Sequence, residues 1–221
     1  MQPKESPLRI ALVEDQVMFR ESMQFLIEES TPHTVVLVAG DGLAYEQLCA
    51  HVSPPDVVIV DLFMPVRDGF ETMAWITLHQ PHTLPLACSF DVDAAAVRGA
   101  LKAGSRGYLH KNCGVHELRD ALEQLRTTGY YYTPLVQEHR AAIEAEERGR
   151  AKVLEALSPR ELEVLQLACT AEELSCKGIA EKLGIGTRTV ESHIRNMCGK
   201  LGVSTRTGLL LTALRWGLVP T

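Results

Sequence analysis

The stretch DVVIVDLFMP, residues 56–65, places four consecutive β-branched apolar residues between two aspartates. A run this short and this apolar is typical of a strand that is buried on both faces, as strands of a parallel sheet are. Asp61, which ends the run, would then lie at the carboxyl edge of the sheet, where ligands of open α/β folds bind. The stretch therefore predicts both a fold class and the place where function should be sought.

Similar apolar runs occur on either side of this stretch and alternate with segments of helical periodicity. We expect strands at 8–13, 34–39, 56–61, 84–89 and 107–110, and helices near 17–29, 42–51, 69–79, 92–103 and 115–127. This alternation predicts a doubly wound α/β domain with a five-stranded parallel sheet over residues 1–127. Residues 128–154 are charged and helix-prone, and we expect them to form a linker that is partly helical.

From residue 155 onward the pattern becomes entirely helical. Ser158, Pro159 and Glu161 form a helix-start signal, and further helices are expected at 175–183, 187–201 and 205–216. Glycines 184, 202 and 217 stand where these later helices should end. Four short helices over residues 155–221 predict a separate all-α helix-turn-helix domain.

The net charge of −6 is unevenly distributed along the chain. Residues 1–127 carry 10 Lys and Arg against 17 Asp and Glu, whereas residues 156–221 carry 8 against 6. An acidic domain followed by a mildly basic one fits a regulated nucleic-acid-binding protein. We find no signal peptide or membrane-spanning run, and the six cysteines include no CxxC pair, so we expect a cytoplasmic protein with reduced thiols and no membrane partner.

Five polar groups are expected to meet at the carboxyl ends of the strands: Glu14, Asp15, Asp61, Ser89 and Lys111. Crowded carboxylates repel one another, and a bound Mg²⁺ would explain why they are tolerated. With a hydroxyl and an ammonium group beside them, such a cluster has the chemistry to accept a phosphoryl group on Asp61.

These residues also carry a resemblance to a known family. The motifs VED at 13–15, DLFMP at 61–65, DG at 68–69 and GYLHK at 107–111, together with Ser89, resemble the receiver domain of two-component response regulators. The resemblance covers the whole of residues 1–127. It implies that Asp61 is the phosphoacceptor, that a sensor histidine kinase supplies the phosphoryl group, and that the protein is not an enzyme.

The resemblance implies roles for further side chains. Mg²⁺ would be held by Glu14, Asp15, Asp61 and the Phe63 backbone carbonyl, and Ser89, Tyr108 and Lys111 would bind the phosphoryl group and switch the domain. Two points stay open at this stage. Glu14 stands where an aspartate is commoner, and Tyr108 could instead be a simply packed aromatic residue.

The segment 187–201 has a single apolar stripe, formed by Val190, Ile194, Met197, Cys198 and Leu201. Its opposite face carries arginines and small polar residues, as a helix that enters the major groove of DNA does. A solvated helix surface would show the same pattern, so the periodicity alone leaves both interpretations open.

A second resemblance concerns this region. The motifs LSPRELEVL at 157–165, IAEKLGI at 179–185, TVESHI at 189–194 and KLGV at 200–203 resemble a LuxR-type helix-turn-helix, which behind a receiver is the arrangement of NarL/FixJ-family response regulators. By position, Glu191, Ser192 and Arg195 would meet base edges. Phosphate contacts would come from Lys177, Thr187, Arg188 and Lys200.

The resemblance implies a phosphorylation-regulated transcription factor that binds double-stranded DNA, with inverted half-sites bound by a homodimer formed on phosphorylation. Leu209, Leu210, Ala213, Leu214 and Trp216 could form the dimer surface or belong to the core. The turn at 169–175 is longer than the family pattern, and we expect its Glu172 and Glu173 to point away from DNA.

Two other functions fit parts of the sequence. A phosphatase with an aspartyl-phosphate intermediate would need a second acid two positions after Asp61, where this chain has Phe63. A regulator that works through protein contacts without phosphate is disfavoured by the complete set of acid, hydroxyl and lysine groups.

Overall fold

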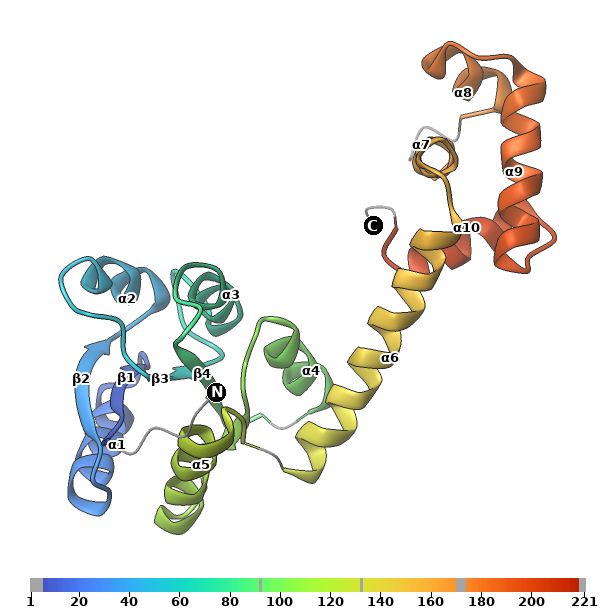
Figure 1. Ribbon diagram of the computed structural model, residues 1–221. Helices are drawn as coiled ribbons and strands as arrows, with labels where there is room; N and C mark the ends of the chain where they lie inside the picture. The colour runs from blue at the N-terminus through green and yellow to red at the C-terminus, as the bar shows by residue number, and fades with distance from the viewer. Residues whose placement is uncertain (1–5, 92, 132, 170–173, 219–221) are drawn as a thin grey trace. The chain divides into compact units, whose positions relative to one another are not determined.

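The computed structural model describes residues 6–91, 93–131, 133–169 and 174–218, and the chain divides into two compact units, residues 1–143 and 144–221. The first unit is an α/β fold and the second is helical, as Figure 1 shows for each. The fold class expected from the sequence is therefore confirmed for both parts of the chain.

The first unit is built on a five-stranded parallel sheet in the order β2-β1-β3-β4-β5. The strands are β1 (Arg9–Val13), β2 (Thr34–Ala39), β3 (Val57–Asp61), β4 (Leu84–Ser89) and β5 (Tyr108–His110). Chain order reverses between β1 and β3, and in such sheets the crevice outside this switch point is where ligands bind. The strand order therefore directs attention to the carboxyl ends of β1 and β3.

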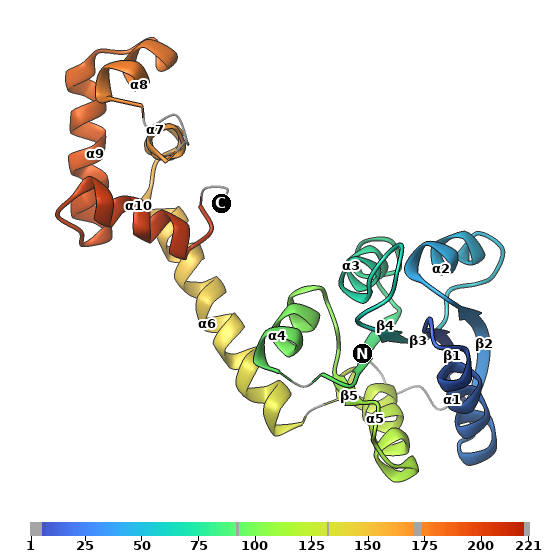
Figure 2. The same cartoon turned by 180° about the vertical axis from the view of Figure 1, so that it is seen from behind.

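Five helices cover the two faces of this sheet: α1 (Val17–Ser30), α2 (Gly42–Cys49), α3 (Gly69–His79), α4 (Ala94–Lys102) and α5 (Val115–Thr128). Met23 and Ile27 of α1 share one buried cluster with α5, whereas α2, α3 and α4 pack into the other. Figures 1 and 2 show the same grouping from opposite sides. Because both faces are covered, β3 and β4 are buried along their whole length.

Helix α6 (Pro134–Ala156) runs through the segment that we expected to be a partly helical linker. It is a continuous helix of 23 residues, and the boundary between the two units falls within it. Val136 joins the core of the first unit and Val153 packs against that of the second. The helix is longer than expected because scattered apolar residues such as these are enough to pack each half against its own unit.

The second unit contains α7 (Pro159–Ala168), α8 (Cys176–Leu183), α9 (Thr187–Leu201) and α10 (Arg206–Arg215). The predicted capping box is present, with the Ser158 hydroxyl accepting from Glu161 N–H and the Glu161 carboxylate accepting from Ser158 N–H. Gly184 and Gly202 end α8 and α9 with positive φ angles, as their positions in the sequence indicated.

The apolar stripe of α9 faces the core of this unit. Val190 and Met197 are fully buried, and Ile194, Cys198 and Leu201 pack around them. The Arg206 guanidinium donates to the carbonyls of Ala168, at the end of α7, and Leu174, before α8. Glu172 and Glu173 lie outside the described residues, so their expected orientation stays a prediction.

Among the described residues, no helix has both the length and the apolar character that crossing a membrane requires.

Candidate functional site

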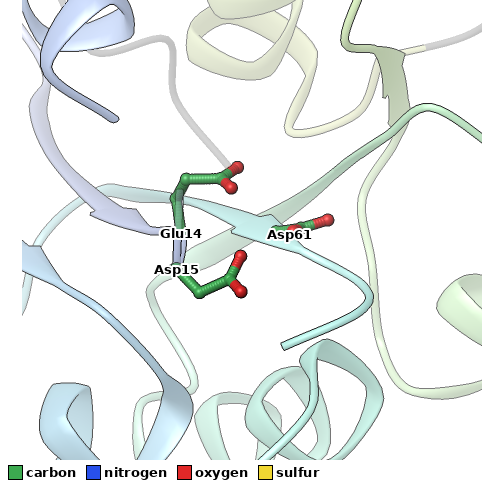
Figure 3. A group of neighbouring side chains, drawn as sticks. All are labelled: Glu14, Asp15 and Asp61. Carbon is green, nitrogen blue, oxygen red and sulfur yellow. The ribbon is translucent and has the colours of Figure 1, made fainter. Parts of the chain in front are cut away.

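The acidic residues expected at the carboxyl edge of the sheet do lie together. Glu14 and Asp15 follow β1 and Asp61 ends β3, and one carboxylate oxygen from each lies within 4.8 Å of the others. Figure 3 shows Glu14 and Asp15 leaving the end of β1 in different directions, with Asp61 beside them. Pairing of β1 with β3 brings together residues that are almost fifty positions apart in the sequence.

Lys111 lies directly after β5 and reaches this cluster. Its ammonium is 2.7 Å from Glu14 Oε2 and 2.9 Å from Asp61 Oδ2, and its side chain is only 1% exposed. A backbone hydrogen bond of 2.9 Å from Lys111 N to the Ser89 carbonyl holds the end of β5 beside β4. The structure therefore gathers the predicted cation and two of the predicted carboxylates into one buried group.

The electrostatics of this group are set by burial and mutual pairing. Burial raises the pKa of Glu14 above its ordinary value, although the hydrogen bond from Lys111 opposes that rise. Burial by itself would lower the pKa of Lys111, but its bonds with Glu14 and Asp61 raise that pKa overall. The lysine consequently stays protonated and serves as a fixed positive charge beside Asp61.

Asp15 differs from its two neighbours because Lys111 does not reach it. Its Oδ1 atom is buried and has no hydrogen-bond partner among the described residues. A buried carboxylate oxygen without a donor is costly, and a hard cation satisfies such an oxygen well. The donor set of Asp15, Asp61 and Glu14 thus fits the Mg²⁺ expected from the sequence.

The two residues expected to switch the domain lie on β4 and β5. Ser89 is buried at the end of β4, and its Oγ accepts a hydrogen bond from Asp91 N at 3.2 Å. Tyr108 is 4% exposed, packs in the core beneath α4, and donates its hydroxyl to the Asp91 carbonyl. Burial raises the pKa of Tyr108 to about 12, with the Ser89 hydroxyl acting in the opposite direction.

Phe63 belongs to the loop that follows Asp61, and Gly69 begins α3 directly after this loop. Phe63 N lies 3.5 Å from Asp61 Oδ1, and its side chain is 55% exposed. Gly69 packs so closely that a Cβ atom there would lie 2.1 Å from the Asp61 carbonyl oxygen. This close approach is the physical reason for the glycine in the motif at 68–69.

Three features of the first unit were not expected from the sequence. Val66, in the same loop, has a φ angle of +69°, which is unusual for a β-branched residue. Phe19 and Phe90 place their rings over the Lys111 ammonium, at 4.8 and 5.3 Å from the ring centroids. Phe90 directly follows Ser89, and its position next to an expected site residue could have marked it in the sequence. Nothing in the sequence pointed to Phe19.

The residues expected to contact DNA are all exposed on α8 and α9: Lys177, Thr187, Arg188, Glu191, Ser192, Arg195 and Lys200. Within the described residues, Arg188, Glu191 and Arg195 form no ion pair with one another or with their surroundings. Lys200 is different, because its ammonium lies 2.7 Å from Glu161 Oε2 and ties α9 to α7. Hydrogen bonds from Lys200 and Ser158 outweigh burial and lower the pKa of Glu161.

The helix considered as a dimer surface divides into two faces. Leu209 and Ala213 of α10 are buried in the core of the second unit, whereas Leu211 and Leu214 are exposed to 62% and 39%. Leu209 and Ala213 therefore stabilise the unit itself, because inward-facing positions recur along a helix at this spacing.

A doubly wound sheet with an acidic pocket, joined to a helix-turn-helix unit, defines the class of receiver-containing DNA-binding regulators. Comparison with known proteins gives the same class. Residues 10–123 match the response regulator receiver domain, and residues 155–213 match the luxR family of bacterial regulatory proteins. The chain belongs to the response regulators with a luxR-family DNA-binding domain; it is a transcriptional regulator and not an enzyme.

Relatives of similar length support this assignment. The chain is 33% identical to the uncharacterized transcriptional regulatory protein YxjL of Bacillus subtilis, over 96% of this chain and 97% of that protein. It is 31% identical to the probable transcriptional regulatory protein NarL of Mycobacterium tuberculosis, with 98% of each chain covered. A crystal structure of a LuxR-family two-component response regulator from Aurantimonas sp. SI85-9A1 is 28% identical, with a TM-score of 0.55, over 63% of this chain and 99% of that one.

Proposed function

We propose that Asp61 accepts a phosphoryl group from a sensor histidine kinase and that this event controls promoter binding by α9. The observation that carries the proposal is the position of the Lys111 ammonium, 2.9 Å from Asp61 Oδ2 inside a cluster of carboxylates. A fixed cation at this distance suits a carboxylate on which phosphoryl charge develops.

In the proposed reaction an Asp61 carboxylate oxygen attacks the phosphorus of a phosphohistidine on the kinase. The new P–O bond forms as the P–N bond breaks, and the leaving histidine takes up a proton. In this proposal Lys111 donates to one phosphoryl oxygen and the Ser89 hydroxyl donates to another. Mg²⁺, held by Asp15, Asp61, the Phe63 carbonyl and Glu14, would neutralise charge on the phosphoryl oxygens.

The switch would use Ser89 and Tyr108. Ser89 moves toward the phosphoryl group, and the Tyr108 ring fills the space inside the domain. In this structure the ring is already buried in that position. In the second unit, Glu191, Ser192 and Arg195 read base edges while Lys177, Thr187 and Arg188 contact phosphates. Lys200 would have to leave or share Glu161 to reach a phosphate, so we rank its contribution below the others.

We further propose that phosphorylation promotes a homodimer on inverted half-sites of double-stranded DNA. The exposed residues Leu211 and Leu214 of α10 are the candidates for the contact between protomers. A two-fold dimer of such units reads two half-sites that are separated by whole turns of the duplex.

The phosphoacceptor is tested with a small phosphoryl donor, phosphoramidate, and Mg²⁺, with intact-mass spectrometry as the measurement. Wild type should gain one phosphoryl group, and Asp61→Asn should gain none. Asp68→Asn is the matched control, because Asp68 caps α3 and asparagine caps equally well. Phosphorylation of Asp61→Asn would remove Asp61 from the proposed role.

The reading face is tested by comparing binding of the phosphorylated full chain to a selected promoter duplex and to a scrambled duplex. Arg195→Ala should lower the discrimination between them at least about tenfold, as the loss of one bidentate base contact does. Arg215→Ala, which removes an exposed arginine from α10, should leave the discrimination unchanged. Full selectivity in Arg195→Ala would show that another face reads DNA.

A further inference from the structure

The Lys111 ammonium has an aromatic environment as well as an acidic one. The centroid of the Phe19 ring, from α1, is 4.8 Å from Nζ, and that of the Phe90 ring, from the loop after β4, is 5.3 Å away. Both distances are within the range in which a ring face attracts a cation. Since Glu14 and Asp61 take the remaining directions, Lys111 is only 1% exposed although it lies at the edge of the sheet.

The two rings support each other. Their centroids are 6.3 Å apart in an edge-to-face arrangement. The backbone of Phe90 is held through its carbonyl, which lies 3.0 Å from His110 Nε2, and the His110 ring also meets the Phe90 ring edge-on. We call Phe19 and Phe90 the aromatic roof.

The exposure of Phe90 shows that core packing does not account for its position. Its side chain is 50% exposed. Phe90 belongs to neither core cluster of this unit, and its ring lies against Lys111, Phe19 and His110.

The roof matters for the chemistry that follows phosphorylation. An aspartyl phosphate is lost when water attacks the phosphorus, the bond between phosphorus and the Asp61 oxygen breaks, and inorganic phosphate leaves as the carboxylate is restored. That step needs water to reach the phosphoryl group, and the Lys111 ammonium beside Asp61 is covered by the two rings.

We propose that Phe90 and Phe19 are positioning residues that hold the Lys111 ammonium against Asp61. By keeping water away from the phosphorylated Asp61, they prolong the phosphorylated state. This inference rests on the proposed phosphorylation of Asp61. It assigns the lifetime of the signal to side chains outside the reacting set of carboxylates, hydroxyl and lysine.

The first measurement needs no phosphate and no metal. Acetylation of lysines by a succinimidyl ester, followed by peptide mass spectrometry, gives the reactivity of Lys111 relative to exposed Lys177 in the full chain. Phe90→Ala should raise this ratio about fivefold, the equivalent of one cation–π contact. Phe90→Tyr, which keeps the ring face, should match wild type, and Phe90→Leu should lie between them. Phe25→Ala, which removes an exposed ring from α1 at a site away from Lys111, is the matched control.

The second measurement is the lifetime of the aspartyl phosphate after removal of phosphoramidate. We expect the lifetime in Phe90→Tyr and Phe25→Ala to equal that of wild type, the lifetime in Phe90→Leu to be shorter, and that in Phe90→Ala to be the shortest. Unchanged Lys111 reactivity in Phe90→Ala, or an unchanged lifetime, would overturn the proposal. If wild type takes up no phosphoryl group, the proposed function and the effect on lifetime both fail, while the reactivity ratio still decides whether the roof holds Lys111.

Discussion

Each unit of this protein contains a lysine paired with a buried glutamate, and the two pairs differ in their surroundings. Lys111 is 1% exposed and shares its ammonium between Glu14 and Asp61. Lys200 is 41% exposed and pairs with Glu161, whose carboxylate also accepts from the Ser158 backbone. The first pair lies inside the acidic pocket of the sheet, whereas the second joins α7 and α9.

The difference shows what burial does to the same two functional groups. Removing charges from water is expensive, and a group of buried charges remains stable only if every member has a counterpart. In the first unit Glu14 and Asp61 share the Lys111 ammonium, whereas Asp15 Oδ1 has no hydrogen-bond donor among the described residues. In the second unit Lys200 is 41% exposed, and its pairing with Glu161 joins α9 to α7.

The largest expected effect is the loss of Lys111, compared with the loss of Lys200. Lys111→Met should destabilise the first unit by about 3 kcal/mol without metal, because two neighbouring buried carboxylates lose their cation. Lys200→Met should cost the second unit at most about 1 kcal/mol, because that lysine is half in water. Urea unfolding checks this with Trp75 reporting on the first unit and Trp216 on the second, in variants that keep one tryptophan. Equal losses would mean that burial does not distinguish the pairs.

A smaller effect is expected from the backbone. In the second unit, the positive φ angles among the described residues belong to glycines, whereas in the first Val66 adopts φ +69°. Val66→Gly should stabilise the first unit by about 1 kcal/mol, because relief of strain exceeds the entropy cost of glycine. Gly184→Val should destabilise the second unit by a similar amount. Thermal unfolding of both variants measures this, and a loss of stability in Val66→Gly would contradict it.

The smallest effect concerns pH. His33 is buried in the first unit, its Nδ1 accepts from Leu8 N, and burial lowers its pKa below the ordinary 6.5. Between that lowered pKa and 6.5 the unfolded chain binds more protons, so stability should fall as pH falls below 6.5. We expect a loss of about 0.5 kcal/mol, of the size of one weak hydrogen bond. His33→Gln, which keeps an acceptor, should remove this part of the pH dependence of urea unfolding followed at Trp75.

Local patterns were sufficient for most of the architecture. Three such features depend only on residues close together in the sequence: the buried run before Asp61, the capping box at Ser158, and the terminal glycines of α8 and α9. They could therefore be predicted from the sequence alone. The exposed face of α9 is of the same kind, because one helical period sorts its residues into an apolar stripe and an exposed side.

The pocket required more than local pattern. Strand periodicity was enough to predict that Glu14, Asp61 and Lys111 lie at the same edge of the sheet. The order of the strands decides which groups bond: Lys111 bonds Glu14 and Asp61 but not Asp15. The rings over Lys111, the φ angle of Val66 and the pairing of Lys200 with Glu161 also depend on packing between segments distant in the chain. Side-chain identity and spacing specify which elements form, whereas distances and burial between groups exist only once the elements have packed.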